Sequence, residues 1–133
     1  MLLENQSFAF KLKNSVSLNE HVFRYCEFAD IQFEGESVTS AFLGSSFIGC
    51  GWYWGVFNTT ILIDVKFLNC TFCGTAFSGA RFINCKFENC KFLKDNLDAE
   101  CRFDEVGWFA CSQENCTGLA DLRDRDSARS HIP

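Results

Sequence analysis

Large apolar residues recur along this chain at every fifth position. Phe, Leu or Trp occupies this central position in twelve consecutive units, which run in one register from Phe42 to Leu97. The same pattern begins upstream at Leu18, loses one residue before Phe42, and continues after one inserted residue through Phe103 and Trp108. A period of five fits neither an α-helix, which repeats every 3.6 residues, nor an ordinary strand, which repeats every two. The pattern therefore indicates a repeat protein.

Each five-residue unit also has a small residue two positions before the central one, such as Cys50 before Trp52. Two positions after the central residue, the chain often carries Gly, Asn or Asp, which turn readily and tolerate a left-handed backbone. These corner positions include Gly44, Gly49, Asp64, Asn69, Gly74, Gly79, Asn84 and Asn89. Each unit is therefore predicted to form one short side of a coil, with two inward side chains and a corner. If four sides close a coil, residues 20 apart stack at the ~4.8 Å spacing of neighbouring strands.

The units Cys70-Thr71-Phe72-Cys73-Gly74 and Cys85-Lys86-Phe87-Glu88-Asn89 resemble those of the pentapeptide-repeat family. The resemblance covers about residues 18–113. It implies an all-β fold, a right-handed quadrilateral β-helix of about five to six coils. We expect this β-helix to span residues 18–115, between an N-terminal cap at 1–17 and a C-terminal cap and tail at 116–133.

The two ends of the chain break the repeat, as the ends of a solenoid must if they are to cover its open coils. At the N-terminus, Phe8, Phe10, Leu12 and Val16 alternate with other residues and suit a capping strand. At the C-terminus we expect a short helix or irregular cap, followed by a disordered tail.

Folding the register four units to a coil predicts which side chains stack. The expected vertical neighbours near the C-terminal end are Phe82 with Phe103, Phe87 with Trp108, and Phe77 with Leu97. Every such column is apolar, and burying each large side chain is worth roughly 1.5 to 3 kcal/mol. The columns therefore predict an apolar interior along the whole tube.

Nine Cys residues are present, an odd number that cannot all pair within one chain. The register predicts a ladder of Cys50, Cys70, Cys90 and Cys111 at the small inward position. Four sulfurs in a line at ~4.8 Å cannot converge on one tetrahedral metal ion. Cys70 and Cys73 have the spacing of a redox pair, but they point to opposite sides of the strand. We therefore interpret the cysteines as core residues and expect no metal and no cofactor.

The net charge of −5 argues against general binding to nucleic acid or to an anionic membrane. No apolar run reaches the ~18 residues of a transmembrane helix, and the first residues do not resemble a signal peptide, so we expect a cytoplasmic protein. His21 and His131 are the only histidines, and no phosphate loop or dinucleotide motif occurs. The protein is therefore predicted not to be an enzyme.

Function is then expected on the outward side chains. One side stacks Leu43, Ile63 and Ile83, the next Ile48 and Leu68, the third Tyr53, Cys73 and Leu93, and the fourth the polar Asn58, Ser78 and Asp98. This apolar belt on three sides suggests a protein interface, although such side chains could also lie flat and shield the backbone. The predicted partner-binding residues are Leu43, Ile48, Tyr53, Trp54, Ile61, Ile63, Leu68, Ile83, Leu93, Asp98 and Asp104.

The favoured hypothesis, which the resemblance to small bacterial members of the family implies, is a bacterial immunity protein that binds a cognate toxin, such as a DNA-acting nuclease, and blocks its active or DNA-binding surface. One alternative, implied by similarity to the quinolone-resistance group, is a DNA-mimicking binder of topoisomerase. Another is a structural or adaptor scaffold. A homodimer through the C-terminal cap also remains open. In each case the expected partner is a protein, without direct contact to nucleic acid or membrane.

Overall fold

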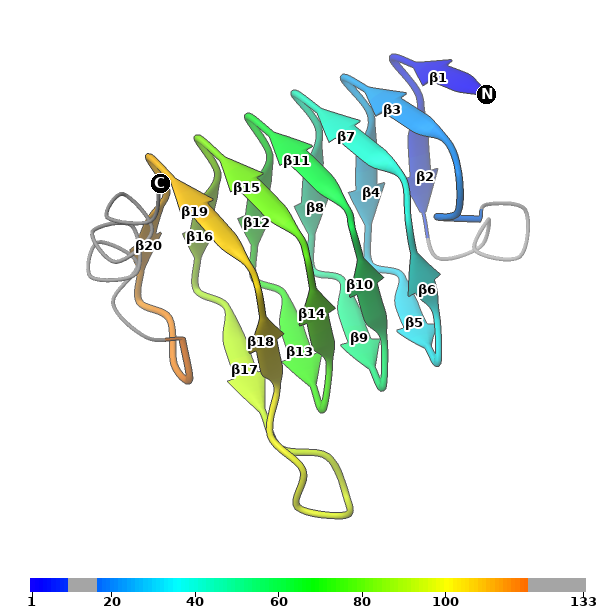
Figure 1. The fold of residues 1–133 in the computed structure, drawn as a ribbon. Helices are drawn as coiled ribbons and strands as arrows, with labels where there is room; N and C mark the ends of the chain where they lie inside the picture. The colour runs from blue at the N-terminus through cyan, green and yellow to red at the C-terminus, as the bar shows by residue number, and fades with distance from the viewer. Residues whose placement is uncertain (10–16, 120–133) are drawn as a thin grey trace.

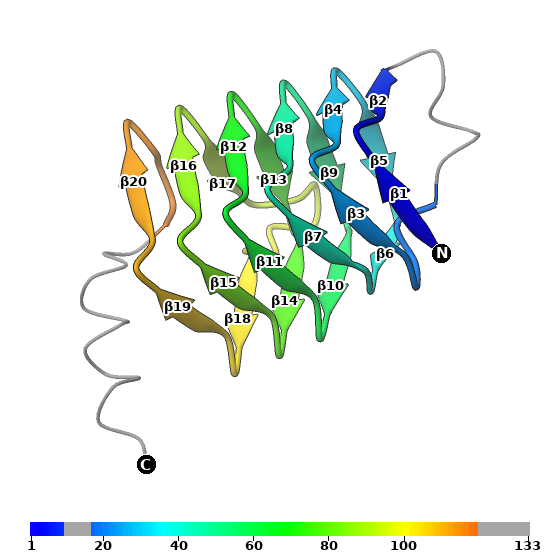
Figure 2. The same ribbon diagram turned by 90° about the horizontal axis from the view of Figure 1, so that it is seen from above.

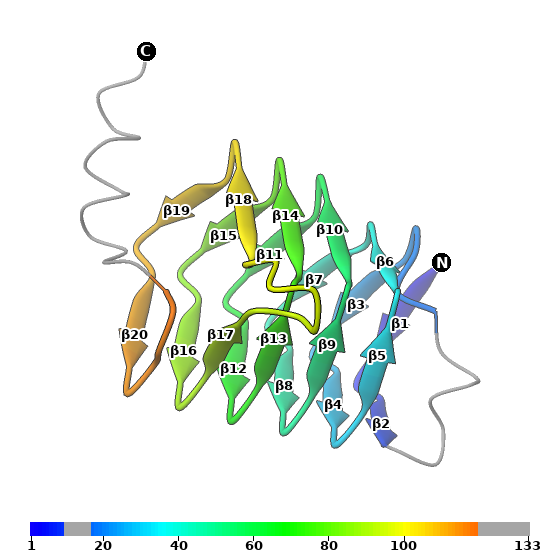
Figure 3. The same ribbon diagram turned by 90° about the horizontal axis from the view of Figure 1, so that it is seen from below.

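The computed structural model describes residues 1–9 and 17–119, which form a four-sided tube of short parallel strands (Figures 1, 2 and 3). We number its faces in the order in which the chain visits them. Face 1 consists of β1 (Leu2–Glu4), β3 (Val22–Arg24), β7 (Ala41–Leu43), β11 (Ile61–Ile63), β15 (Arg81–Ile83) and β19 (Gly107–Phe109). Face 2 consists of β2 (Ser7–Ala9), β4 (Glu27–Ala29), β8 (Ser46–Ile48), β12 (Lys66–Leu68), β16 (Lys86–Glu88) and β20 (Ser112–Glu114). Face 3 consists of β5 (Gln32–Glu34), β9 (Gly51–Tyr53), β13 (Thr71–Cys73) and β17 (Lys91–Leu93), and face 4 of β6 (Ser37–Val38), β10 (Val56–Asn58), β14 (Ala76–Ser78) and β18 (Arg102–Asp104).

The strands form four complete coils, from β3 to β18, with a half coil at each end. This architecture confirms the predicted all-β quadrilateral β-helix. The first half coil, β1 and β2, begins well before residue 18, because Leu3 and Phe8 already hold central positions and pair with Phe23 and Phe28. Two strands thus lie within residues 1–17, the segment expected to form the N-terminal cap. Phe10, Leu12 and Val16 of the expected capping strand, and the C-terminal helix or tail expected beyond residue 119, lie outside the described residues.

The interior is a set of stacked aromatic rings. Phe67 lies parallel to Phe87 with ring centroids 4.8 Å apart, and Trp52 lies parallel to Phe72 at 4.9 Å. These distances match the spacing of neighbouring strands, so each coil places its ring directly over the ring of the coil before. Rings on adjacent faces meet edge-on or tilted, the arrangement that aromatic quadrupoles favour, as Phe47 does with Trp52.

All eight predicted corner residues adopt a positive φ, from +52° at Gly74 to +65° at Gly49 and Gly79. At each corner the backbone N–H donates to the next coil: Gly44 N–H donates to the carbonyl of Ile63, and Asp64 N–H to that of Ile83, both at 2.9 Å. Asn and Asp tolerate this left-handed conformation and Gly adopts it freely. The turn residues therefore set both the corner and the link between coils.

The small inward position has a polar role that its size alone did not indicate. Cys70 Sγ–H donates to the carbonyl of Phe47 at 3.3 Å, and Cys90 Sγ–H donates to that of Phe67 at 3.4 Å. Thr60 Oγ1–H makes the same kind of bond to Val38 at 2.6 Å. Each of these side chains satisfies a carbonyl of the preceding coil, which explains why Cys, Ser and Thr all serve at this position.

The columns near the C-terminal end differ from those expected. Phe103 pairs with Phe77 on face 4, and Trp108 pairs with Phe82 on face 1, although 26 positions now separate each pair instead of 20. With six additional residues, the corner between β17 and β18 becomes a loop of eight residues, 94–101, which projects from the tube (Figure 1). Leu97, expected in the core over Phe77, lies in this loop with 77% of its surface exposed.

The loop also changes the cysteine ladder. Cys116, not Cys111, lies over Cys90, since Lys91 bridges to Thr117 and Cys116 Sγ–H donates to the carbonyl of Phe87. Cys111 instead follows Cys85, because β16 pairs with β20. The expected ladder of Cys50, Cys70 and Cys90 is correct, but its last member was wrong. The period shows only one extra residue before Phe103, whereas the chain inserts six residues at this corner.

Truncating a central ring should cost much more than truncating an outward side chain. Phe72 is fully buried between Trp52 and Phe92, so we expect Phe72→Ala to lower the free energy of unfolding by about 3 to 5 kcal/mol. Val56 is exposed, and Val56→Ala is expected to stay within about 0.5 kcal/mol of the unchanged protein. Urea denaturation followed by circular dichroism measures both. Equal losses for the two variants would contradict the stacked core.

Candidate protein-binding surface

The outer surface of face 1 is apolar over its central coils. One outward column contains Leu43, Ile63 and Ile83, in register on β7, β11 and β15, and Phe109 of β19 continues it. The other column contains Leu2, Val22, Ala41 and Ile61. Ile61 and Phe109 are 43% and 42% exposed, so these side chains do not merely cover their own backbone. An apolar stretch of this kind, on both columns of one flat face, is typical of an interaction site.

Charged groups lie toward the ends of face 1. Arg24 forms an ion pair with Glu4 near the N-terminal end. Near the other end, the Arg81 guanidinium donates to the carbonyls of Gly79 and Glu105, which fixes it against the corner with face 4. The centre of the face, at β7 and β11, therefore has no charged side chain on its outward positions.

The apolar belt expected on three sides is interrupted between faces. Ile48 and Leu68 are stacked on face 2, as predicted, but the polar column of Ser46, Lys66 and Lys86 separates them from face 1. On face 3, Tyr53, Cys73 and Leu93 stack in the predicted order. The continuous apolar surface is therefore face 1, and Ile48, Leu68 and Leu93 form smaller patches.

Two of the predicted binding residues hold the projecting loop. Trp54 Nε1–H donates to Asp95 Oδ2 at 2.7 Å, and the Asn96 N–H donates to the Tyr53 hydroxyl at 2.8 Å. The rings of Tyr53 and Trp54 lie against each other with centroids 4.7 Å apart. Trp54 therefore lies at the corner of faces 3 and 4, with face 4 between it and Ile61, and does not join the surface of face 1.

Asp95 organises the loop from within. Its Oδ1 accepts hydrogen bonds from the backbone N–H groups of Leu97 and Ala99, and its Oδ2 accepts the bond from Trp54. These donors, with the Ala99 N–H first, lower the pKa of the Asp95 carboxyl below its ordinary value. Gly74 lies beneath, where a Cβ atom would approach Asp95 Oδ2 to 2.7 Å. A side chain at position 74 would therefore displace the carboxylate.

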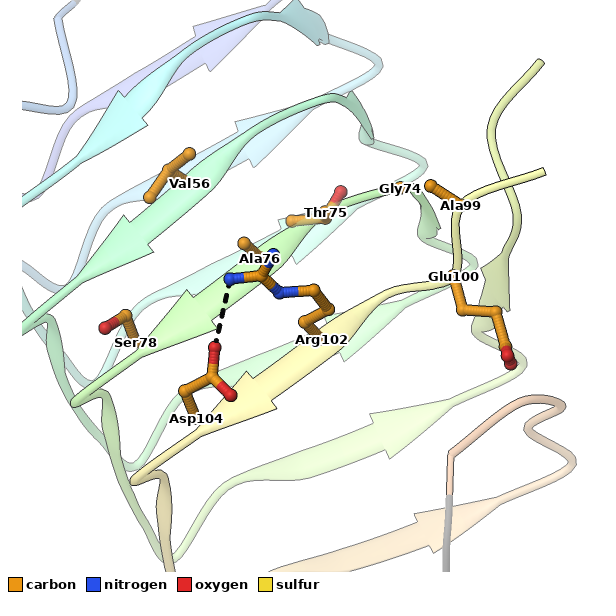
Figure 4. Close-up of a pocket in the computed structure, with 9 residues that line it drawn as sticks. All are labelled: Val56, Gly74, Thr75, Ala76, Ser78, Ala99, Glu100, Arg102 and Asp104. Atoms are coloured by element: carbon orange, nitrogen blue, oxygen red, sulfur yellow. Dashed lines mark hydrogen bonds and ion pairs between the residues drawn. The ribbon is translucent and has the colours of Figure 1, made fainter. Parts of the chain in front are cut away.

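A shallow groove lies between the loop and face 4 (Figure 4). Its volume is about 400 Å³; Val56 and Ala76 form part of its floor, and Ala99 belongs to the loop on one side. Arg102 crosses the groove and pairs with Asp104 at 3.2 Å. Both of these side chains are largely exposed, so the groove offers charged and apolar contacts without enclosing a ligand.

The two predicted acidic residues lie apart. Asp98 is in the loop, where Lys94 pairs with it at 3.4 Å, and not over Ser78 on face 4 as expected. Asp104 takes that position, in register with Ser78. The sequence signal for the loop was the step of six residues from Leu97 to Phe103, but an insertion that keeps an apolar residue at the expected position cannot be told from a continued repeat by period alone.

Residues 60–92 match the family model described as pentapeptide repeats (8 copies). This segment therefore consists of pentapeptide repeats. A crystal structure of a pentapeptide-repeat protein, Rfr23 from the cyanobacterium Cyanothece 51142, has the same fold, with a TM-score of 0.61 and 10% sequence identity over 87% of this chain and 83% of Rfr23. Trypsin-treated QnrB1, a plasmid-mediated fluoroquinolone resistance protein, gives a TM-score of 0.47 and 16% identity over 87% of this chain and 52% of QnrB1, too loose an overlay to support any transfer of function. No curated protein sequence matches the chain significantly.

Within the described residues, no group of three or more His, Cys, Asp or Glu side chains is arranged to hold a metal ion. The same residues include no helix that could cross a bilayer. Burial raises the pKa of the Cys50 thiol to about 11 and also raises the pKa of the Cys73 thiol on face 3. These two thiols are thus protonated near neutral pH, which makes them weak nucleophiles and weak metal ligands.

Replacing Gly74 should loosen the loop. Gly74→Ala places a methyl group against Asp95 and also carries the cost of about 1 to 2 kcal/mol for a left-handed non-glycine residue. Gly35 has a similar φ of +63°, and no atom lies within 4 Å of the place that a Cβ would take there, so Gly35→Ala is the matched control for backbone strain alone. We expect faster amide hydrogen exchange at residues 96–99 in Gly74→Ala only. Equal exchange in both variants would contradict the contact between Gly74 and Asp95.

The loop should also respond to acid. A carboxyl whose pKa is lowered on folding stabilises the folded arrangement fully above its ordinary pKa of 3.8, and this contribution is lost as the pH falls further, through the pKa of the folded protein. We expect Trp54 fluorescence, obtained by subtracting the spectrum of Trp54→Phe, to change in that range. Asp95→Asn should remove the transition, whereas Asp98→Asn should keep it. A transition that persists in Asp95→Asn would assign it to another group.

Proposed function

We propose that this protein is a non-enzymatic binding protein that docks onto a protein partner through face 1 and blocks the surface it covers. The apolar outer surface of face 1 is the observation that carries this proposal. It extends over two columns and has its most exposed large side chains at Leu2, Ile61 and Phe109. The strand of Ile61 pairs with strands on both sides, and the strands of Leu2 and Phe109 each pair with one neighbour, so little conformational entropy is lost when a partner binds.

The interior supports a role outside catalysis. It is filled by stacked rings, and its small polar side chains donate their hydrogens to backbone carbonyls. His21 lies beside Phe23 near the N-terminal end, with no described nucleophile bonded to its side chain. General base catalysis requires a histidine or similar group within hydrogen-bond reach of the group it activates. The surface of the tube is accordingly the part of the molecule that acts.

We further propose that the partner is a toxin and that the protein acts as its immunity protein, possessing no activity of its own. A neutraliser must stay bound, and a buried apolar contact surrounded by polar residues gives slow dissociation. The polar edges of face 1, with Ser46, Lys66 and Lys86 on one side, provide such a rim. A DNA-acting nuclease is one toxin that such a protein would block by covering its active or DNA-binding surface.

A second candidate is a DNA-mimicking binder of topoisomerase. The observation that favours it is the acidic cluster formed by the loop and the adjoining part of face 4, with Asp98, Glu100, Asp104 and Glu105. Of these four residues, Glu100 and Asp104 line the groove (Figure 4), and none belongs to a strand of face 1. A partner that binds DNA would therefore use a different side of the tube. An adaptor scaffold would use face 1 without inhibiting what it binds.

The experiment compares two substitutions of the same kind on different faces. Ile61 and Val56 each begin a strand, point outward and are 43% and 39% exposed. The partner is captured at low salt from the cell that makes the protein, identified by mass spectrometry, and titrated against each variant. We expect Ile61→Asp to weaken binding at least about tenfold, or about 1.4 kcal/mol, and Val56→Asp to leave affinity within about twofold.

The identity and activity of the partner then separate the candidates. A toxin whose activity is abolished by one equivalent of the protein supports the immunity role. Loss of affinity in Val56→Asp alone, with a topoisomerase as the captured partner, would favour the groove and the DNA-mimic alternative. A partner that keeps its full activity when bound would indicate a scaffold.

A further inference from the structure

We propose that the partner of face 1 is a concave protein whose cleft also contacts the edges of faces 2 and 4 that adjoin face 1, without reaching Val56 at the far edge of face 4, and that it is neither a flat surface nor a second copy of this chain. This inference rests on the proposed docking through face 1. It adds the shape of the partner and the charges around its cleft.

The size of face 1 is the first argument. Each strand has three residues, so the face is about 10 Å wide at ~3.3 Å per residue, and six strands at ~4.8 Å make it about 24 Å tall. The flat footprint is therefore about 240 Å², whereas each side of a stable interface buries about 800 Å². Even if side-chain relief doubles the footprint, face 1 alone falls short. A stable complex must extend around the corners.

The corners beside face 1 allow this close approach. On the side of face 4 they carry Thr59 and Gly79, and on the side of face 2 they carry Gly44 and Asn84, all small residues at positive φ. Asn84 is held down by its hydrogen bond to Asp64 at 2.6 Å. These four corner residues have short side chains, and the long side chains nearest to them are Tyr25, whose ring lies beside Gly44, and Arg81, whose guanidinium donates to the Gly79 carbonyl. A partner can follow the surface around both edges.

In the third and fourth coils, the edges of faces 2 and 4 that adjoin face 1 carry charges of opposite sign, whereas Glu27 lies on the same edge of face 2 in the first coil. Lys66 and Lys86 of face 2 lie next to the shared corner, with 49% and 58% of their side chains exposed, and both reach toward the single carboxylate of Glu88. On the other side, Asp104 and Glu105 lie at the corner of face 4, where Asp104 is 57% exposed. A complementary cleft thus has an apolar floor, an acidic edge over face 2 and a basic edge over face 4. This asymmetry allows only one orientation of the tube in the cleft.

A second copy of this chain does not meet these requirements. Two tubes in contact through face 1 are both convex, and they would bury only about 500 to 1,000 Å² in total, below the ~1,200 Å² of stable interfaces. Neither tube could reach around the corners of the other. A concave partner is the occupant that the area and the charge pattern favour.

Site-specific photo-crosslinking in the cell that makes the protein tests the shape directly. The photoreactive residue p-benzoylphenylalanine replaces one outward residue at a time: Ile61 on face 1, Lys66 on face 2, Asn58 on face 4, and Lys91 on face 3 as the control. After irradiation, adducts are separated by mass and the attached protein is identified. We expect one and the same protein attached at Ile61, Lys66 and Asn58, with at least a tenfold lower yield at Lys91.

Charge reversal provides a second test, in which the crosslinker stays at one position on face 1 and the charges on faces 2 and 4 are changed. The crosslinker is placed at Leu43, because replacing this residue removes no charged side chain. In this background, Lys66→Glu with Lys86→Glu should lower the initial rate of adduct formation at least about threefold. Asp104→Lys with Glu105→Lys should do the same. Gln32→Glu on face 3 is the control and should leave the rate unchanged.

The outcomes separate the two proposals. Attachment at Ile61 but not at Lys66 or Asn58 would overturn the concave partner while keeping face 1 as the docking surface. An adduct of twice the mass of this chain would identify a second copy and also overturn it. No adduct at Ile61, with attachment at Lys91, would overturn the proposed docking through face 1 itself. Circular dichroism of each variant verifies that the β-helix has formed.

Discussion

The vertical register between coils is the constraint on which the other features of this structure depend. Stacked rings such as Phe67 and Phe87 lie parallel only because each coil returns the chain to the same place one strand spacing higher. The same register brings Cys70 under Cys90 and lets each thiol reach a carbonyl of the coil before. It also aligns the outward columns, so a surface such as Leu43, Ile63 and Ile83 is a direct product of the way the core packs.

Packed side chains fill the interior of the tube, so its exterior is the surface available to a partner. Two regions of that exterior differ from a plain polar surface: the apolar face 1, and the loop at the corner of faces 3 and 4 with its groove. They lie on different sides of the tube (Figures 1 and 3). Rigid strands carry the first, whereas the second depends on a small network around Asp95, Tyr53 and Trp54. Their physical independence means that a change in one need not disturb the other.

The loop illustrates how a repeat protein acquires a special feature without losing its core. Six residues are inserted at one corner, and β18 still pairs with β14 in full register. Gly74 supplies the space for Asp95, and Tyr53 and Trp54 of the preceding coil supply two of the hydrogen-bonding groups. Each strand pairs with the equivalent strand of the preceding coil, and the corner residues that connect it to the previous strand take no part in this pairing. The tube therefore tolerates a long insertion at a corner. The cost is confined to the loop.

The sequence by itself determined the type of fold, the inward rings, the corners at positive φ and the outward columns on β7 to β17, because a five-residue period repeats the same local chemistry in every unit. It also determined which residues are outward, so the period alone identifies Leu43, Ile61, Ile63 and Ile83 as surface residues. Only the tertiary structure decided where the tube begins and that Leu97 lies outside the core. It also showed that Cys116, in place of Cys111, continues the cysteine ladder, and that Trp54 is hydrogen-bonded to the loop and is not part of the surface of face 1. Those features depend on contacts between coils after an insertion. The five-residue period of the sequence does not show how many of the inserted residues lie in a corner.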